Sequence, residues 1–221
     1  MKILLTGGSG QLGQELLKLR KYLAPSHHDM DITDEASIKK YLAKHKPDLI
    51  VHAAAYTNTS LPEKDATAAA ACYKVNVLGT RNLVRSAACP IIFISTESVL
   101  EPHNFYVLTK IQAEKEITQH TNYKIIRTSF RFNPFEYDKA CTDMLTLADV
   151  VEKIAPLVDK SVDLPCENNI VYVGTGVKTV YDLAKQTRPD VTPVTRNDLH
   201  ANLPAMHSLL SIQPSLYAEN N

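Results

Sequence analysis

Near the start of the chain a glycine-rich segment, Gly7-Gly8-Ser9-Gly10-Gln11-Leu12-Gly13, follows the apolar run Ile3-Leu4-Leu5. Gly7, Gly10 and Gly13 lie three residues apart, and their missing Cβ atoms let the chain turn tightly between a strand and a helix. A pyrophosphate can then reach the amide groups at the start of that helix. The segment therefore predicts a dinucleotide-binding turn, and an ordinary strand-to-helix turn is the alternative.

A second segment, Tyr106-Val107-Leu108-Thr109-Lys110, places a tyrosine and a lysine four residues apart. On a helix this spacing brings the ammonium group beneath the phenol ring, and we expect its charge to lower the pKa of Tyr106 from the usual value of about 10. Such a tyrosine can protonate an alkoxide while a hydride reaches a carbonyl carbon. Tyr106 and Lys110 are therefore candidate catalytic residues.

The context of this pair matters more than its spacing. Tyr106 follows the apolar run Ile91-Ile92-Phe93-Ile94, which ends in the hydroxyl pair Ser95-Thr96, and a hydroxyl at the end of a central strand can hold a substrate carbonyl oxygen. Tyr181 and Lys185 have the same spacing without such a strand. We interpret that second pair as a solvated helix face.

The rest of the chain predicts the scaffold that would position these groups. Short β-type runs alternate with helical patterns, which is typical of an α/β fold with a doubly wound parallel sheet. The expected strands are Lys2–Thr6, Asp48–His52, Ile91–Ser95, Lys124–Arg127 and Ile170–Val173. The expected helices are Gln11–Leu23, Glu35–His45, Ala66–Ala88, Phe105–His120, Leu147–Val158 and Val180–Gln186.

We expect residues 1–221 to form a single domain. Its cofactor-binding core would cover residues 1–130, and the reduced substrate-side region would follow from about residue 131 to 221. Six prolines gather between residues 156 and 214 of that region, so we expect irregular connections there around one more strand and helix.

Composition narrows the classes of partner. With 24 basic and 24 acidic side chains the chain has no net charge, which argues against nucleic acid or a membrane surface as a partner. The four cysteines lack Cys-x-x-Cys spacing and the eight histidines place no two ligands on one helical face, so no metal site is predicted. No leader or membrane-length apolar run is present, and we expect a soluble cytoplasmic protein. The oligomeric state stays open, with a homo-oligomer among the options.

Further motifs follow in a fixed order: Asp31-Ile32-Thr33-Asp34, the segment 47–57 containing Ala53-Ala54-Ala55-Tyr56-Thr57, Val75-Asn76, and Ile126-Arg127-Thr128-Ser129. Together with the glycine turn, Ser95-Thr96 and the Tyr106 and Lys110 pair, this set resembles the extended short-chain dehydrogenase/reductase superfamily. Within it the chain resembles the dTDP-4-dehydrorhamnose reductase family. The resemblance spans residues 1 to about 130 and implies a Rossmann fold that binds NAD(P)H.

The resemblance also implies roles for individual residues. Thr96, Tyr106 and Lys110 would form the catalytic trio, with Tyr106 and Lys110 also contacting the cofactor and Asn76 supporting the lysine. The remaining cofactor-binding residues would be Gly7, Gly10, Gly13, Gln11 and Leu12 at the pyrophosphate, Asp31 and Ile32 near adenine, and Ala53, Ala54 and Tyr56 near the ribose and nicotinamide. The implied reaction is reduction of the 4-keto group of a nucleoside-diphosphate 4-keto-6-deoxyhexose, so the implied partner is a nucleotide sugar.

Some features depart from the family. Only Glu97 through Phe105 separate Thr96 from Tyr106, where relatives carry a longer loop, and the stretch Ser26-His27-His28 has no arginine for a cofactor 2′-phosphate. We therefore expect NADH to be accepted at least as well as NADPH.

The departures leave two alternatives to a reductase. One is a non-catalytic dinucleotide-binding regulatory subunit, similar to the beta subunit of methionine adenosyltransferase. The other is a sugar-nucleotide epimerase or dehydratase that uses Glu97 as an acid or base. Arg131 is a candidate for a substrate phosphate or an ordinary surface residue, and His52 is expected to be a satisfied interior histidine.

Overall fold

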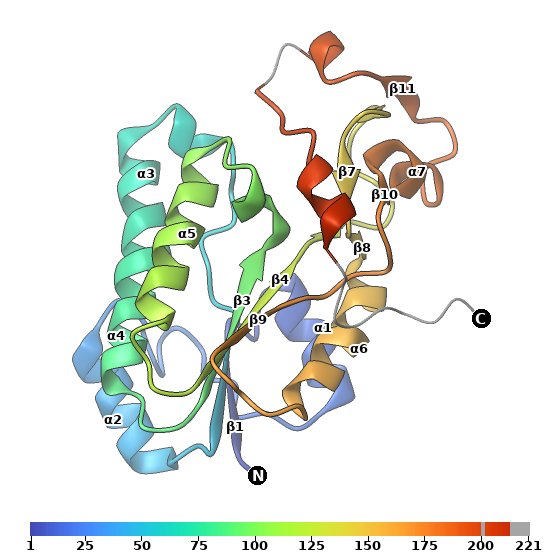
Figure 1. Ribbon diagram of the computed structural model, residues 1–221. Helices are drawn as coiled ribbons and strands as arrows, with labels where there is room; N and C mark the ends of the chain where they lie inside the picture. Colours follow the sequence, from blue (N-terminus) through green and yellow to red (C-terminus); the bar gives the residue numbers. More distant parts are fainter. Residues whose placement is uncertain (200–201, 213–221) are drawn as a thin grey trace.

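The computed structural model describes residues 1–199 and 202–212, and a parallel five-stranded sheet lies at its centre (Figure 1). The strand order is β1-β2-β3-β4-β9, and every neighbouring pair is parallel. The strands are β1 (Ile3–Thr6), β2 (Leu49–His52), β3 (Ile91–Thr96), β4 (Tyr123–Thr128) and β9 (Asn169–Tyr172). All five strands expected from the apolar runs are present, which confirms the predicted doubly wound sheet.

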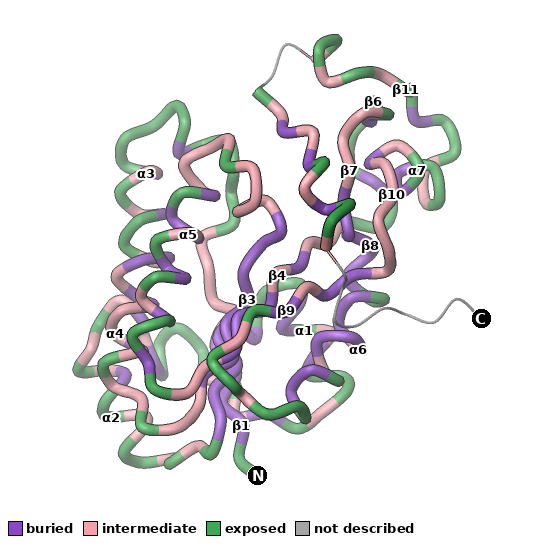
Figure 2. The backbone as a smooth tube through the Cα atoms, in the orientation of Figure 1, coloured by how far each residue is buried: buried purple, intermediate pink, exposed green. Residues whose placement is uncertain are grey.

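Helices cover both faces of this sheet (Figure 1). They are α1 (Gln11–Leu19), α2 (Glu35–His45), α3 (Ala66–Tyr73), α4 (Thr80–Ser86), α5 (Phe105–Ile117), α6 (Val151–Val162) and α7 (Val180–Lys185). Alternate residues of a strand point to opposite faces. Ile92 and Ile94 of β3 accordingly pack in the core with α1 and α6, whereas Ile91 and Phe93 pack in the core with α2, α4 and α5. Figure 2 shows the buried residues concentrated on these central strands.

Three expected helices differ from the prediction. The helix predicted over 66–88 is divided, because the π-helix Lys74–Gly79 separates α3 from α4. The helix predicted to reach Leu23 ends at Leu19, and Leu23 instead pairs with the edge of β1, where Leu5 N donates to Leu23 O over 2.8 Å. The helix predicted from Leu147 begins at Val151, because residues before it form short strands.

The carboxyl-terminal region holds more strands than the single one expected. Three two-stranded sheets form there, pairing β5 with β8, β10 with β7, and β11 with β6. Their bounds are β5 (Phe130–Arg131), β6 (Lys139–Cys141), β7 (Leu145–Thr146), β8 (Asp149–Val150), β10 (Lys178–Thr179) and β11 (Thr192–Val194). Among the described residues, no helix is long and apolar enough to cross a membrane.

Candidate functional site

The glycine turn joins β1 to α1, and its glycines serve different purposes. Gly7 has φ +77°, and a Cβ atom there would lie 2.6 Å from Ala54 N. A Cβ atom on Gly13 would lie 2.2 Å from Gly7 O. The fold itself therefore requires glycine at positions 7 and 13.

Gly10 is different, because its backbone is extended (φ −76°) and a Cβ atom there would meet only Gly7 O, at 3.3 Å. Packing within the protein therefore gives little reason for glycine at position 10. A ligand that approaches the amide groups at the start of α1 would explain the glycine, because a side chain there would lie in its path. The turn fits a pyrophosphate on this observation.

The side chains next to this turn divide into exposed and buried. Gln11 is exposed, whereas Leu12 is 4% exposed and packs into the core between the sheet and α6. Only the backbone of Leu12 is free to line a pyrophosphate. The roles predicted for both residues stay predictions, limited for Leu12 to its amide group.

The two residues expected near adenine lie after the Leu23 bridge. The Asp31 carboxylate accepts a hydrogen bond from Thr33 N over 2.8 Å and lies 3.4 Å from His27 Nε2. Ile32 is buried in the core, and a Cβ atom on Gly79 of the π-helix would lie 3.0 Å from its Cδ1 atom. Their role at adenine remains a prediction.

A directed chain of hydrogen bonds passes through the fully buried His52 at the end of β2. Ala54 N donates to Thr6 Oγ1, and the Thr6 hydroxyl lies 2.7 Å from His52 Nδ1. On the other side His52 Nε2 lies 3.0 Å from Thr80 Oγ1, which itself donates to Asn76 O. Burial, helped by the charge of Lys110, lowers the pKa of His52 to about 3. His52 is therefore a neutral interior histidine, as predicted.

Asn76 connects the loop after β2 to helix α5. Its Oδ1 atom accepts from Tyr56 N over 2.7 Å, and its Nδ2 atom donates to Tyr56 O and to Thr109 Oγ1 over 3.2 and 2.9 Å. The Thr109 hydroxyl in turn donates to Tyr106 O over 2.6 Å. Asn76 thus holds Tyr56 against the turn of α5 that carries Tyr106. These side-chain contacts lead to Thr109, and the support for Lys110 that the resemblance implies, through backbone and water contacts, stays a prediction.

Lys110 is 2% exposed and is held on β3. Its Nζ atom donates to Ile94 O over 2.7 Å and lies 4.0 Å from the centre of the Phe93 ring. Burial lowers the pKa of Lys110 to about 7 and raises the pKa of Tyr106 to about 12. The expectation that the pKa of Tyr106 is lowered is wrong for this structure, because burial of the phenol raises that pKa.

Thr96 is the last residue of β3, and α5 packs beside that strand (Figure 1). Its Oγ1 atom accepts a hydrogen bond from Ser98 N over 3.2 Å and caps the 3-10 turn Glu97–Leu100. A hydroxyl that accepts one bond keeps its own proton for another acceptor. Thr96 can therefore donate to an oxygen placed beyond the strand end.

Two glutamates of the turn after Thr96 hold later parts of the chain. Glu97 is 3% exposed and accepts from Thr146 Oγ1 over 2.5 Å and from Leu147 N over 2.7 Å. Glu101 accepts from Met206 N over 2.8 Å and from the Ser208 hydroxyl over 3.0 Å. Burial raises the pKa of Glu97, but both of its oxygens already accept hydrogen bonds. Glu97 therefore anchors the strand β7 rather than presenting a free acid or base.

Arg131 and the second tyrosine–lysine pair have distinct environments. Arg131 is half-buried, and its Nε atom is enclosed without a hydrogen-bond partner among the described residues. Lys185 is exposed, with its Nζ atom 5.7 Å from the centre of the Tyr181 ring. The prediction of a solvated helix face is correct for Lys185 and wrong for Tyr181, because the Tyr181 ring packs against the cluster that contains Phe135 and Val180.

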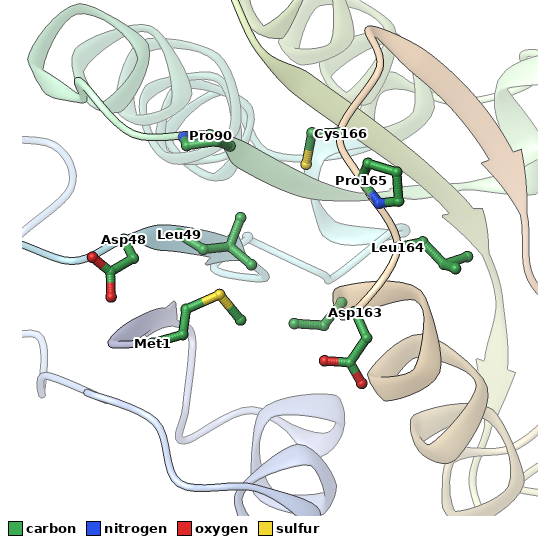
Figure 3. Close-up of a pocket in the computed structure, with 9 residues that line it drawn as sticks. Met1, Asp48, Leu49, Pro90, Asp163, Leu164, Pro165 and Cys166 are labelled. Atoms are coloured by element: carbon green, nitrogen blue, oxygen red, sulfur yellow. The ribbon is translucent and has the colours of Figure 1, made fainter.

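Hollows at the surface of the described chain include the following two. One, of about 260 Å³, is lined by Met1, Asp48, Leu49, Pro90 and residues 162–166 (Figure 3). It lies where β2 and β3 begin, at the opposite end of the sheet from Thr96. The other, of about 310 Å³, lies beside the start of α5 and is lined by Glu63, residues 102–105, Leu108 and Asn202. Among the described residues, no three His, Cys, Asp or Glu side chains gather as a metal site would require.

Residues 1–171 match the family described as "RmlD substrate binding domain". The chain belongs to this family. A dTDP-4-dehydrorhamnose reductase of Aggregatibacter actinomycetemcomitans is 30% identical over 158 residues, which cover 61% of this chain and 53% of the relative. The chain thus spans about half the length of that relative. A GDP-6-deoxy-D-talose 4-dehydrogenase of the same organism is 25% identical over 93% of this chain and 87% of its own length.

Solved structures show the same fold. The dTDP-4-dehydrorhamnose reductase from Bacillus anthracis str. Ames, in complex with NADP, has a TM-score of 0.79 at 19% identity and covers 97% of this chain and 95% of its own. The ortholog from Clostridium acetobutylicum has a TM-score of 0.78 at 24% identity, over 92% and 87% of the two chains. The predicted Rossmann architecture is therefore confirmed.

Proposed function

We propose that this chain is an NAD(P)H-dependent reductase of the 4-keto group of a nucleoside-diphosphate 4-keto-6-deoxyhexose. The observation that carries the proposal is the buried Lys110 of α5, which lies one helical turn from Tyr106 and donates to Ile94 O of β3, the strand that ends in Thr96. The family match and the names of the relatives support the same reaction class.

The reduced nicotinamide supplies a hydride when the cofactor is bound. Thr96 donates its remaining hydroxyl proton to the carbonyl oxygen and so stabilises the negative charge that develops there. Tyr106 then gives the phenol proton to that oxygen. Lys110 would hold the cofactor ribose and would offset the negative charge that Tyr106 acquires when it gives up its proton. The amide groups that Gly10 leaves uncovered would bind the pyrophosphate.

The protonation state of Tyr106 suits a proton donor. Burial raises the pKa of Tyr106 to about 12, so the phenol holds its proton at neutral pH, as a general acid must before it donates.

A non-catalytic dinucleotide-binding regulatory subunit is the second candidate. Its support is the contact of Glu101 with Met206 and Ser208, which lays the carboxyl-terminal segment against the short connection after Thr96. An epimerase or dehydratase is disfavoured because Glu97, the acid or base it would need, is occupied by Thr146 and Leu147.

The deciding experiment incubates the purified protein with NADH or NADPH and a panel of 4-keto-6-deoxyhexose nucleotides, and follows the absorbance of the reduced cofactor. Oxidation of the cofactor that depends on one of these sugars supports the reductase. Dinucleotide binding without turnover on any member of the panel contradicts it and favours the regulatory subunit.

A further inference from the structure

A buried ion pair lies one helical turn beyond Lys110. Arg127 on β4 donates from Nε to Glu114 Oε1 over 3.0 Å and from Nη2 to Glu114 Oε2 over 2.6 Å. Glu114 is 7% exposed, and a third donor, Ser95 Oγ, reaches its Oε1 atom over 2.6 Å. Arg127 also donates from Nη1 to the Tyr172 hydroxyl over 2.6 Å. Both oxygens of this carboxylate are thus fixed by partners from β3 and β4.

The pair connects the two elements that carry the candidate catalytic groups. Glu114 follows Lys110 by four residues on α5, so the two side chains share one face of the helix. Ser95 directly precedes Thr96 at the end of β3. One carboxylate therefore lies beside the lysine and is also bonded to the strand end next to Thr96.

We propose that Glu114, held in place by Arg127, is a positioning residue that keeps the Lys110 ammonium charged and fixes the end of β3 against α5. The effect of Glu114 on turnover rests on the proposed function. Its effect on the charge state of Lys110 does not, because that charge state can be measured without turnover.

The other groups facing Lys110 are uncharged near neutral pH. Burial raises the pKa of the Cys72 thiol on α3 and of the Tyr106 phenol on α5, and it lowers the pKa of His52 on β2. From β3 the lysine meets the Phe93 ring and a carbonyl oxygen. Burial lowers the pKa of Lys110 to about 7, while the charge of Glu114 opposes that change. Glu114 therefore supplies the negative charge nearest to Lys110 along α5, and the Arg127 guanidinium, bonded to both of its oxygens, offsets part of that charge.

The test removes both charges together, because deleting one partner would leave the other buried and unpaired. The variant is Glu114→Gln with Arg127→Met. The matched control is Arg20→Met with Asp159→Asn, which removes another two-bond guanidinium–carboxylate pair. There Arg20 donates from Nε to Asp159 Oδ1 over 2.9 Å and from Nη2 to Oδ2 over 3.1 Å. That pair joins the end of α1 to α6, on the other face of the sheet. Thermal melting of each variant establishes that it folds.

The readout is the pH midpoint of the Lys110 amine in ¹⁵N-lysine NMR spectra, assigned by its loss in Lys110→Met. We expect the midpoint to fall in the double variant, but by less than the shift of about 1 to 3 pH units that the loss of one nearby opposite charge produces, because the positive charge of Arg127 leaves with the negative charge of Glu114. It should stay unchanged in the control. Glu114→Gln alone, whose amide oxygen still accepts from Arg127, is the second variant and should shift in the same direction.

An unchanged Lys110 midpoint in a folded Glu114 variant would overturn the inference. Where the wild type reduces a keto sugar, the alkaline loss of kcat should begin at a lower pH in the double variant, with a smaller effect on KM. A wild type without turnover would contradict the proposed function, and the Lys110 titration would still decide the inference.

Discussion

The Nε2 atom of His52 lies 3.0 Å from Thr80 Oγ1, and the Thr80 hydroxyl donates its hydrogen bond to the carbonyl oxygen of Asn76. The His52 nitrogen must therefore be the donor in its contact with Thr80. Its other nitrogen is then free to accept from Thr6, which is the arrangement of a neutral imidazole. The imidazole thus joins β1 and β2 to the π-helix that carries Asn76.

This arrangement predicts a loss of stability in acid. The pKa of His52 is about 3 in the folded protein against an ordinary value of 6.5, so the unfolded chain binds the extra proton as pH falls from 6.5 toward 3. Between about pH 7 and about pH 5 the wild type should lose about 2 kcal/mol of unfolding free energy through this residue. Urea unfolding at the two pH values measures it. His52→Gln should lose correspondingly less over the same interval, and an equal loss would refute the assignment.

Substitutions in the glycine turn should affect dinucleotide binding and folding separately. Gly10→Ala should weaken dinucleotide affinity by about tenfold or more, because the new methyl group lies where phosphates approach the backbone. Its melting temperature should change little, since the added Cβ meets only Gly7 O at 3.3 Å. Calorimetric titration with NADH and NADPH gives the affinity. Gly13→Ala is the control and should melt much earlier, because its Cβ would lie 2.2 Å from the same oxygen.

Replacing Tyr106 tests the proton donor. Tyr106→Phe should reduce kcat by about a hundredfold to ten-thousandfold with nearly unchanged cofactor affinity, because the ring stays and only the transferable proton is lost. Lys110→Met should weaken both turnover and cofactor binding. Tyr181→Phe, in the pair with identical spacing, should change neither. Wild-type turnover in Tyr106→Phe would show that another group donates the proton.

Cofactor preference tests the segment before Asp31. NADH should be accepted at least as well as NADPH, because no arginine occupies positions 26–28 and His27 lies 3.4 Å from the Asp31 carboxylate, which offsets its charge when protonated. Steady-state kcat/KM for both cofactors measures the preference. A strong preference for NADPH would contradict this prediction.

The anchoring role of Glu97 predicts a stability effect without a catalytic signature. Glu97→Gln puts an NH₂ group opposite one of the present donors, so the unfolding free energy should fall by about 1 to 3 kcal/mol. The shape of the pH–rate profile should match that of the wild type. A profile that loses one limb in Glu97→Gln would restore Glu97 as an acid or base.

Local sequence signals were sufficient to predict an element where residues next to it in the sequence determine where it begins and ends. Helix α2 runs over Glu35–His45 as predicted, because the Asp34 side chain caps Ala36 N and Lys46 ends the helix with φ 47°. The five sheet strands were recognisable as short apolar runs that end in polar residues. Both kinds of signal lie within a few residues of the element that they define.

Long-range contacts explain the misplaced elements. Leu147 continues the helical pattern of α6, but its amide group donates to Glu97, 50 residues earlier, and the chain there is extended. Leu23 likewise pairs with β1 instead of continuing α1. Periodicity within a window contains no information about partners so far away.

The candidate site was predictable in its residue types and less so in its electrostatics. The spacing of Tyr106 and Lys110 indicated the pair, but the position of the ammonium on Ile94 O depends on the packing of α5 against β3. Sequence reasoning passed over Glu114 and Thr109. A usable signal was present for Glu114, since a carboxylate at a helix position between the buried Ala113 and Ile117 must find a partner in the interior.

Glu101 lies one short turn after Thr96 at the end of β3. Its carboxylate accepts a hydrogen bond from Met206 N, 105 residues later in the chain. Binding equilibria at coupled places are reciprocal. Suppose that docking of residues 206–208 raises the affinity of a ligand for the end of β3 by some factor. Binding of that ligand then raises the docking equilibrium constant of residues 206–208 by the same factor. The contacts of Glu101 with residues 206 and 208 thus couple ligand binding at the end of β3 to the docking of this later segment.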